Sequence, residues 1–109
     1  MENDVIIIGG GAAGLCAAGF ALKRGLSVTV VEKNDRPARK VMITGKGRCN
    51  LTNCCDTDTL IGSMTKNSRF MFSAFHSFSA YDTMELFEQE LHVPLKVERG
   101  GRVFPVSDK

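Results

Sequence analysis

The fold of this 109-residue chain is decided by the stretch VIIIGGGAAG at residues 5–14. Four consecutive β-branched residues predict a strand that is buried on both faces, as the strands of parallel sheets are. Three glycines end that strand, and the alanines that follow begin a segment rich in helix formers. The stretch therefore predicts a strand, a tight glycine turn and a helix.

The sequence that follows completes a strand–helix–strand unit. We expect the helix over Ala12–Arg24, with small residues along one side and Gly25 just past its end. Ser27–Val31 returns to β-branched residues and stops at Glu32, which predicts a second strand parallel to the first. A connection of this kind crosses over right-handed.

The remaining residues predict a basic loop, two helices and a hairpin. Residues 33–53 show neither the helical nor the strand periodicity of hydrophobic residues, which predicts a long ordered loop or a helix followed by a loop. The two helices and the two strands, which Gly100-Gly101 joins, are expected at Ser68–His76, Asp82–Leu91, Leu95–Arg99 and Arg102–Phe104. Asp82 and Glu85 have the spacing of a capping box. The predicted fold class is α/β, a parallel sheet with appended helices and a β-hairpin.

Composition excludes several protein classes. Hydrophobic residues make up 43% and charged residues 24%, which is typical of a globular domain and excludes disordered and fibrous proteins. The uncharged run at residues 5–22 contains glycines and follows an acidic segment, which argues against a membrane span or an export signal. The four cysteines are then expected to be thiols, and the expected compartment is the cytoplasm. Residues 33–48 hold six cations against one acid, which indicates an anionic ligand.

Gly9 to Gly14 matches the G-x-G-x-x-G pattern of dinucleotide-binding turns. Gly9 permits the tight turn, Gly11 lets the backbone approach a pyrophosphate, and Gly14 allows close contact between helix and strand. Glu32 ends the second strand, where a carboxylate accepts hydrogen bonds from ribose hydroxyls and repels the 2′-phosphate of NADP. A glycine-rich turn that joins any strand to any helix is the alternative for the glycines alone. Together with Glu32 they specify the predicted α/β fold as a Rossmann-type FAD/NAD(P)-binding parallel sheet with appended helices and a β-hairpin.

The basic segment after the second strand distinguishes an FAD site from an NAD site. A nicotinamide domain continues with another crossover helix, whereas here a Gly/Thr/Asn loop follows that can offer N–H groups and cations to a pyrophosphate and a flavin ring. The residues expected to bind the cofactor are Gly9, Gly11, Ala12, Ala13, Gly14, Glu32, Lys33, Lys40, Thr44, Gly45, Gly47, Arg48 and Asn50.

Three blocks of sequence carry a family resemblance: Gly9–Gly14 with Glu32-Lys33-Asn34, then Ile43–Asn53, then Gly101–Lys109. Together they resemble the BaiN/RdsA-type FAD-dependent oxidoreductases, also labelled aminoacetone-oxidase-like. The resemblance implies FAD, flavin-mediated redox chemistry in a bacterial cytoplasm, and NAD(P)H as a candidate electron donor. Lys46, Ala38 and His92 depart from the family, which usually has glycine at these positions.

Members of that family are longer than this chain, with an inserted second domain and a later segment that completes the flavin site. Ser107-Asp108 also has the composition of a helix start. We therefore expect residues 1–109 to be the N-terminal part of an FAD-binding domain whose other domains lie outside this chain. The expected function is hydride transfer, by way of the flavin, between NAD(P)H or a reduced substrate and a small organic molecule.

Two other functions stay open at this point. Cys49 and Cys54 have the spacing of the redox pair in flavin disulfide reductases, although Asn53 and Cys55 flank Cys54 where that pattern differs. A non-catalytic dinucleotide-binding module is the second alternative. No residue is assigned as catalytic, and no metal site is expected, because no second cysteine pair exists. Nucleic acid is not expected as a partner, since the basic segment lacks aromatic residues. A membrane is not expected either, because the uncharged run contains glycines and follows an acidic segment.

Overall fold

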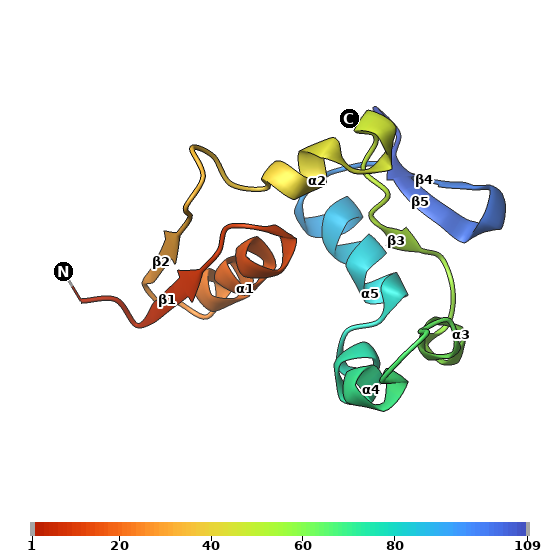
Figure 1. Ribbon diagram of the computed structural model, residues 1–109, viewed down its shortest axis with the longest axis horizontal. Coiled ribbons are helices and arrows are strands. Elements are labelled where there is room, and N and C mark those ends of the chain that lie inside the picture. Colours follow the sequence, from red (N-terminus) through yellow and green to blue (C-terminus); the bar gives the residue numbers. More distant parts are fainter. Residues whose placement is uncertain (1, 109) are drawn as a thin grey trace. The chain divides into compact units, whose positions relative to one another are not determined.

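The computed structural model describes residues 2–108, which form two compact units (Figure 1). The first unit ends at Lys46 and the second begins at Gly47. A parallel strand pair with a helix forms the first unit, and an antiparallel sheet with helices forms the second. The predicted α/β fold class is confirmed.

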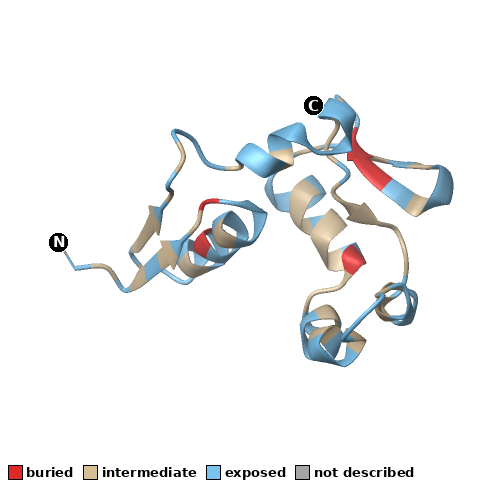
Figure 2. Cartoon of the chain, in the orientation of Figure 1, coloured by how far each residue is buried: buried red, intermediate tan, exposed pale blue. Residues whose placement is uncertain are grey.

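The first unit is built on the predicted strand–helix–strand. Strands β1 (Val5–Ile8) and β2 (Val28–Val31) pair in parallel, in a register that places Val5 beside Val28 and Ile8 beside Val31. Helix α1 (Ala12–Lys23) packs on both strands, with Ala18 buried. The buried residues of this unit lie in α1 and in the turn before it, where Gly10 is buried (Figure 2).

Helix α1 ends as the sequence predicts. Gly25 has a φ of +79°, and its N–H donates to the Leu22 carbonyl at 2.9 Å. The N–H of Leu26 donates to the Ala21 carbonyl at 3.2 Å. These two bonds form the Schellman motif that a glycine in the left-handed conformation permits.

The basic segment after β2 forms a helix followed by a loop, which was one of the two forms expected for it. Helix α2 (Arg39–Ile43) begins after Ala38, and Thr44 ends it. The loop continues through η1 (Gly45–Gly47), where the φ angles are 61°, 54° and 84°. Three consecutive left-handed residues are unusual, because the conformation crowds the Cβ atom of every residue except glycine.

The second unit contains the predicted hairpin and one additional strand. Strands β4 (Leu95–Glu98) and β5 (Arg102–Pro105) pair antiparallel, with the turn at η3 (Arg99–Gly101). Strand β3 (Thr52–Asn53) pairs with the other edge of β5. It was not predicted, because two residues are too few to show an alternating pattern. Val103 and Phe104 of the central strand are buried.

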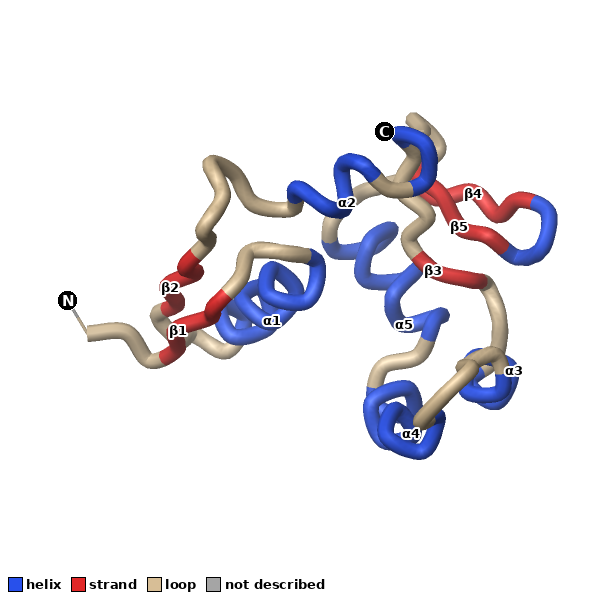
Figure 3. Tube along the Cα trace, in the orientation of Figure 1, coloured by secondary structure: helices blue, strands red, loops and turns tan. Residues whose placement is uncertain are grey.

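The helices of the second unit are α3 (Thr57–Gly62), α4 (Ser68–Ser77), α5 (Ala80–Glu85) and the π-helical segment η2 (Leu86–Glu90). The helix predicted at Ser68–His76 is confirmed as α4, which packs against α3 (Figure 3). Helix α3 was missed, although its N-cap Asp56 accepts a hydrogen bond from the Thr59 N–H at 2.8 Å. None of the helices within residues 2–108 is long and apolar enough to cross a membrane.

The predicted capping box at Asp82 and Glu85 is wrong. The box is formed by Ser79 and Asp82: the Asp82 N–H donates to Ser79 Oγ at 3.1 Å, and the Ser79 N–H donates to Asp82 Oδ2 at 2.8 Å. Ser79 therefore starts α5 earlier than expected, and Asp82 is the third helical residue rather than the cap. The two candidate boxes have equivalent spacings, so local sequence did not distinguish them.

The positions that depart from the family resemblance share one backbone conformation. Ala38, Lys46 and His92 have φ angles of 57°, 54° and 55°. This left-handed region is the one that glycine occupies without steric cost. The family preference for glycine at these positions therefore has a physical cause, and this chain carries strain at each of them.

We expect His92→Gly to stabilise the second unit, by about 1 kcal/mol, because it removes a left-handed Cβ. The control is Ala74→Gly at an exposed position inside α4, which should destabilise the chain by a similar amount, about 1 kcal/mol. Chemical denaturation of both variants measures the two effects. A loss of stability in His92→Gly would contradict the strain argument.

Candidate functional site

The glycine turn after β1 is held from both sides by the segment that follows β2. The Gly10 N–H donates to Glu32 Oε2 at 2.8 Å, and the Gly10 carbonyl accepts from the Ala38 N–H at 2.7 Å. A Cβ atom at Gly10 would meet the Cβ of Pro37 at 3.1 Å. Gly10, to which the motif assigns no role, is therefore the contact point between the turn and the returning chain.

Gly9 and Gly14 meet the structural demands that the motif predicts. Gly9 has a φ of +102°, and its N–H donates to the Val31 carbonyl at 2.8 Å. A Cβ atom at Gly14 would lie 1.9 Å from the Gly9 carbonyl oxygen. Because no side chain fits in that gap, Gly14 allows α1 to begin directly against the turn.

Gly11 differs from its neighbours, because neither its φ nor a neighbouring atom in residues 2–108 requires it to be glycine. Its φ of −83° suits any residue, and a Cβ built there would meet no atom within 4 Å. The absence of a side chain leaves open space at the start of α1. Such space permits the close approach of a ligand to the backbone.

The first turn of α1 offers hydrogen-bond donors to an anion. Its N-cap, Gly11, has no side chain to accept from these N–H groups, and residues 12–14 include no acid. The first N–H groups of a helix lack partners within the helix and carry the positive end of its dipole. Ala12, Ala13 and Gly14 therefore place backbone donors where a phosphate binds well.

The Glu32 carboxylate is held in place and kept ionised by the surrounding backbone. Its Oε1 accepts from the backbone N–H and the side-chain amide of Asn34, both at 2.9 Å, and its Oε2 accepts from Gly10. The Asn34 N–H, followed by the Gly10 N–H, lowers the pKa of Glu32. The Lys33 N–H also lowers this pKa, with a smaller effect. Four donors thus favour the ionised form, and an ionised carboxylate is a strong acceptor for a ligand hydroxyl.

These elements line one open pocket of about 380 Å³ in the first unit. The volume is near the small end of the range for small-molecule sites, about 300–1,000 Å³. Five predicted site residues lie on it, namely Gly9, Gly11, Glu32, Lys33 and Lys40. Five residues that the prediction did not name complete the lining: Ile8, Val31, Asn34, Ala38 and Arg39.

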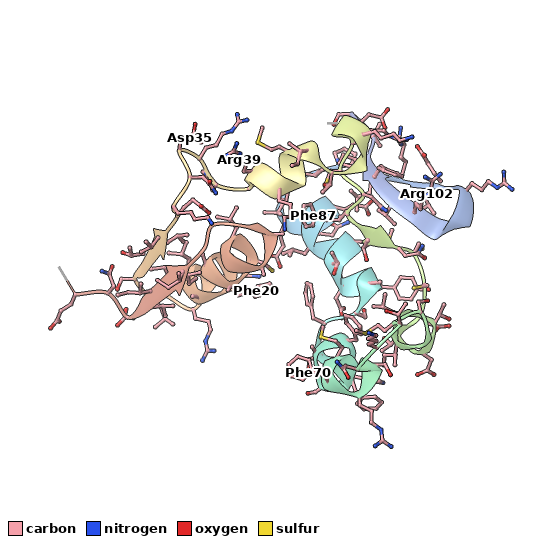
Figure 4. All side chains as sticks on the ribbon, viewed as in Figure 1. Phe20, Asp35, Arg39, Phe70, Phe87 and Arg102 are labelled. Atoms are coloured by element: carbon pink, nitrogen blue, oxygen red, sulfur yellow. The ribbon has the colours of Figure 1, made fainter. Side chains whose placement is uncertain are left out.

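Two of the missed residues left a signal in the sequence. Asn34 follows Glu32 by two positions, a spacing at which an amide can orient a neighbouring carboxylate. Arg39 belongs to the cationic residues of the segment 33–48 and is the first residue of α2 (Figure 4). Its Nη1 donates to the Asn34 side-chain oxygen at 3.3 Å. The apolar wall of Ile8 and Val31 could be assigned only from the structure.

Eight predicted site residues are not among those that line this pocket: Ala12, Ala13 and Gly14, described above, and the five that follow. Thr44 and Gly45 follow α2, and the Thr44 hydroxyl donates to the Val41 carbonyl at 2.9 Å. Gly47, Arg48 and Asn50 belong to the second unit. There the Arg48 guanidinium forms ion pairs with Glu98 and Asp108. The roles of these five residues toward a cofactor stay predictions.

The cysteines and histidines form no recognisable site in the described part of the chain. All four cysteines are free, and residues 2–108 contain no group of three His, Cys, Asp or Glu side chains placed to hold a metal ion. Burial raises the pKa of Cys55, which disfavours its reactive thiolate form. The His76 ring lies against Phe72, with centroids 4.1 Å apart, and its Nδ1 lies 2.8 Å from the Phe72 carbonyl oxygen.

Substitution of three glycines by alanine should separate binding from folding. We expect Gly11→Ala to cost only about 0.5–1 kcal/mol of stability, because alanine is a poorer N-cap than glycine, but to weaken ADP binding by about tenfold, because its methyl group occupies the ligand space. Gly14→Ala should destabilise the first unit by about 1–3 kcal/mol, because its Cβ overlaps the Gly9 carbonyl.

The third variant, Gly19→Ala, is the control within α1, since a Cβ there would meet no atom within 4 Å. It should stabilise the helix by about 0.5–1 kcal/mol and leave ADP binding unchanged. Calorimetric titration and thermal unfolding of the three variants give both quantities. Equal ADP affinity in Gly11→Ala and Gly19→Ala would rule out the predicted approach at Gly11.

Comparisons with known proteins agree with this geometry. Residues 3–109 match the family described as HI0933-like protein Rossmann domain. Similar curated proteins include a 3-dehydro-bile acid delta(4,6)-reductase from Clostridium scindens, 34% identical over 98% of this chain and 26% of the relative. The ribosomal RNA dihydrouridine synthases of Escherichia coli and Haemophilus influenzae are 35% and 36% identical, over 76% and 81% of this chain and 20% and 21% of theirs.

The chain thus spans about a fifth to a quarter of the length of the curated relatives that it matches. The family match includes both units of the structure and all the residues that line the pocket. It also agrees with the resemblance carried by the glycine turn and the two later blocks of sequence. The chain therefore belongs to the HI0933-like family of Rossmann-domain flavoproteins.

Proposed function

We propose that this chain holds the ADP half of FAD in an oxidoreductase that transfers hydride, by way of the flavin, between NAD(P)H or a reduced substrate and a small organic molecule. The observation that carries the proposal is the pocket between the glycine turn and the Glu32 carboxylate. An uncapped helix start and an ionised carboxylate together suit a nucleotide that carries phosphates at one end and ribose hydroxyls at the other.

The residues present fit an FAD pyrophosphate. Gly11 leaves space where a Cβ would otherwise stand, and the first N–H groups of α1 have no capping side chain. Three cationic side chains, Lys33, Arg39 and Lys40, line the same pocket as the single carboxylate of Glu32. We assign phosphate binding to Gly9, Gly11, Ala12, Ala13 and Gly14 with Lys40, and ribose binding to Glu32 with Lys33.

The proposed role of this chain is to bind and orient the cofactor. When bound, FAD supplies the hydride acceptor and donor of the reaction. Glu32, which Gly10 and Asn34 hold in place at the end of β2, would accept a hydrogen bond from a ribose hydroxyl. The backbone donors of α1 would compensate the pyrophosphate charge. We further propose that the loop at Thr44, Gly45, Gly47 and Asn50 faces the remainder of FAD.

The substrate is proposed to be a small molecule, and the compartment the cytoplasm. The relative that covers nearly the whole chain is named as a reductase of a bile acid derivative, which supports a small organic acceptor. The two relatives named as ribosomal RNA dihydrouridine synthases point instead to an RNA substrate. Reduction assays with a bile acid derivative and with ribosomal RNA, each with NADH or NADPH as donor, distinguish the two substrate classes.

Extraction of the ligand from the complete natural protein tests the function. We expect a yellow protein whose heat-released ligand has the absorbance spectrum and mass of FAD. Glu32→Ala should lose about 1.5–3 kcal/mol of FAD binding, because a hydrogen bond to a charged group disappears. Asp35→Asn is the control, since this neighbouring carboxylate is exposed and does not line the pocket. Colourless protein that takes up no FAD would refute the proposal.

We also propose that Cys49 and Cys54 are not a redox relay. Both thiols are free and half-buried; in the sequence, Cys49 precedes β3 and Cys54 follows it. Cys54→Ser should leave turnover nearly unchanged, as should Cys49→Ser. The disulfide-reductase alternative predicts a long-wavelength charge-transfer band between thiolate and flavin after two-electron reduction. Appearance of that band in the wild type, with its loss in Cys54→Ser, would establish the alternative.

A further inference from the structure

Arg48 is surrounded by acidic and aromatic partners within the second unit. Its Nη2 pairs with Glu98 Oε2, and its Nε and Nη2 both lie 3.1 Å from Asp108 Oδ1. The guanidinium carbon is 3.9 Å from the centroid of the Phe104 ring, a distance typical of a cation–π contact. The guanidinium therefore bridges two carboxylates while it lies over a buried ring.

A second cation completes this cluster, which we call the Arg48 cluster: Arg48, Lys96, Glu98 and Asp108. Lys96 Nζ lies 2.7 Å from Asp108 Oδ1 and 3.6 Å from Glu98 Oε2. The hydrogen bond from Arg48 lowers the pKa of Glu98, and the one from Lys96 lowers the pKa of Asp108, so both carboxylates are ionised at neutral pH. Two positive and two negative charges leave the cluster neutral, unlike a site for phosphate.

The Arg48 cluster lies at the start of residues 48–54, a segment whose backbone is hydrogen-bonded to β5. The Leu51 N–H donates to the Val103 carbonyl at 2.9 Å, and the Cys54 N–H donates to the Gly101 carbonyl at 2.7 Å. Between them, β3 pairs with β5. Arg48 is thus the first anchored residue after the three left-handed residues of η1.

The conformation of η1 needs such an anchor. Lys46 is a non-glycine residue in the left-handed region, where its Cβ atom crowds the backbone. A strained loop conformation persists only where neighbouring structure fixes it. The residue that follows η1 directly and has its side chain fixed by ionic and aromatic contacts is Arg48.

We propose that Arg48 is a positioning residue: held by Glu98, Asp108 and Phe104, it fixes the conformation of the Gly45–Gly47 loop and acts on FAD through that loop rather than by contact with a phosphate. This inference rests on the proposed function. It revises the direct cofactor contact that the sequence suggests for Arg48. It also gives Glu98, which is distant in sequence, a role in cofactor binding.

The two roles predict opposite results for Glu98→Gln. If Arg48 contacted a phosphate, release from Glu98 would leave FAD affinity unchanged or increase it. If Arg48 positions the loop, Glu98→Gln should weaken FAD binding about as much as Arg48→Ala does, by about tenfold, and the double variant should lose no more than either single variant. Arg48→Lys should also be weakened, because a lysine cannot bridge both carboxylates and stack on Phe104.

The measurement is titration of the complete natural protein with FAD, together with the visible spectrum of the bound flavin. The Arg48 and Glu98 variants should shift that spectrum in the same direction, whereas a loss of stability alone would lower the melting temperature without a spectral shift. Arg99→Ala removes one exposed cation from the same unit and serves as the control, with unchanged affinity.

The outcomes separate the inference from the function on which it rests. Full affinity in Glu98→Gln or Arg48→Lys, or additive losses in the double variant, would overturn the positioning role and leave the proposed function intact. Absence of FAD binding by the wild type would refute both. If Arg48→Ala does not fold, Glu98→Gln and Arg48→Lys still decide between the two roles.

Discussion

The first unit depends on one polar contact, the hydrogen bond from the Gly10 N–H to the Glu32 carboxylate. It joins the glycine turn after β1 to the end of β2, which are far apart in sequence. The same carboxylate accepts two bonds from Asn34, and the Gly10 carbonyl accepts one from Ala38. A single charged side chain thereby positions the turn, the returning chain and the wall of the pocket. The residue expected to bind ribose is also the residue that assembles the site.

The cations of the chain fall into two groups with different surroundings. Lys33, Arg39 and Lys40 line a pocket whose single acid, Glu32, is bonded to the backbone. Arg48 and Lys96 are neutralised by two carboxylates. The first arrangement favours an anionic ligand, because its positive charge is not balanced within the pocket. The second stabilises local structure. A count of cations along the basic segment does not reveal this difference.

Two of the five non-glycine residues with a left-handed φ in the described chain lie in segments that carry predicted site residues. Ala38 precedes α2 and lines the pocket, and Lys46 lies in the loop between α2 and Arg48. Glycine would relieve the strain at both positions. The chain retains side chains there, so neighbouring contacts must hold these conformations. The Ala38 N–H does so by its bond to Gly10, and we have proposed that the Arg48 cluster does so for Lys46.

The sequence alone determined the elements whose causes are local. The β-branched run of β1, the end of α1 at Gly25, helix α4 and the hairpin turn at Gly100 follow from patterns within a few residues, and all were predicted. The family was also identifiable, since the glycine turn and the later motifs are contiguous in sequence. The role of Gly10, the partners of Arg48 and the start of α5 were decided by tertiary structure. In each case the local sequence is compatible with two roles for the same residue. Asp82 could be the cap or the third residue of its helix, and Arg48 could bind a phosphate or pair with Glu98. Only the folded chain makes that choice, because it brings residues as distant as Arg48 and Glu98 within hydrogen-bonding distance.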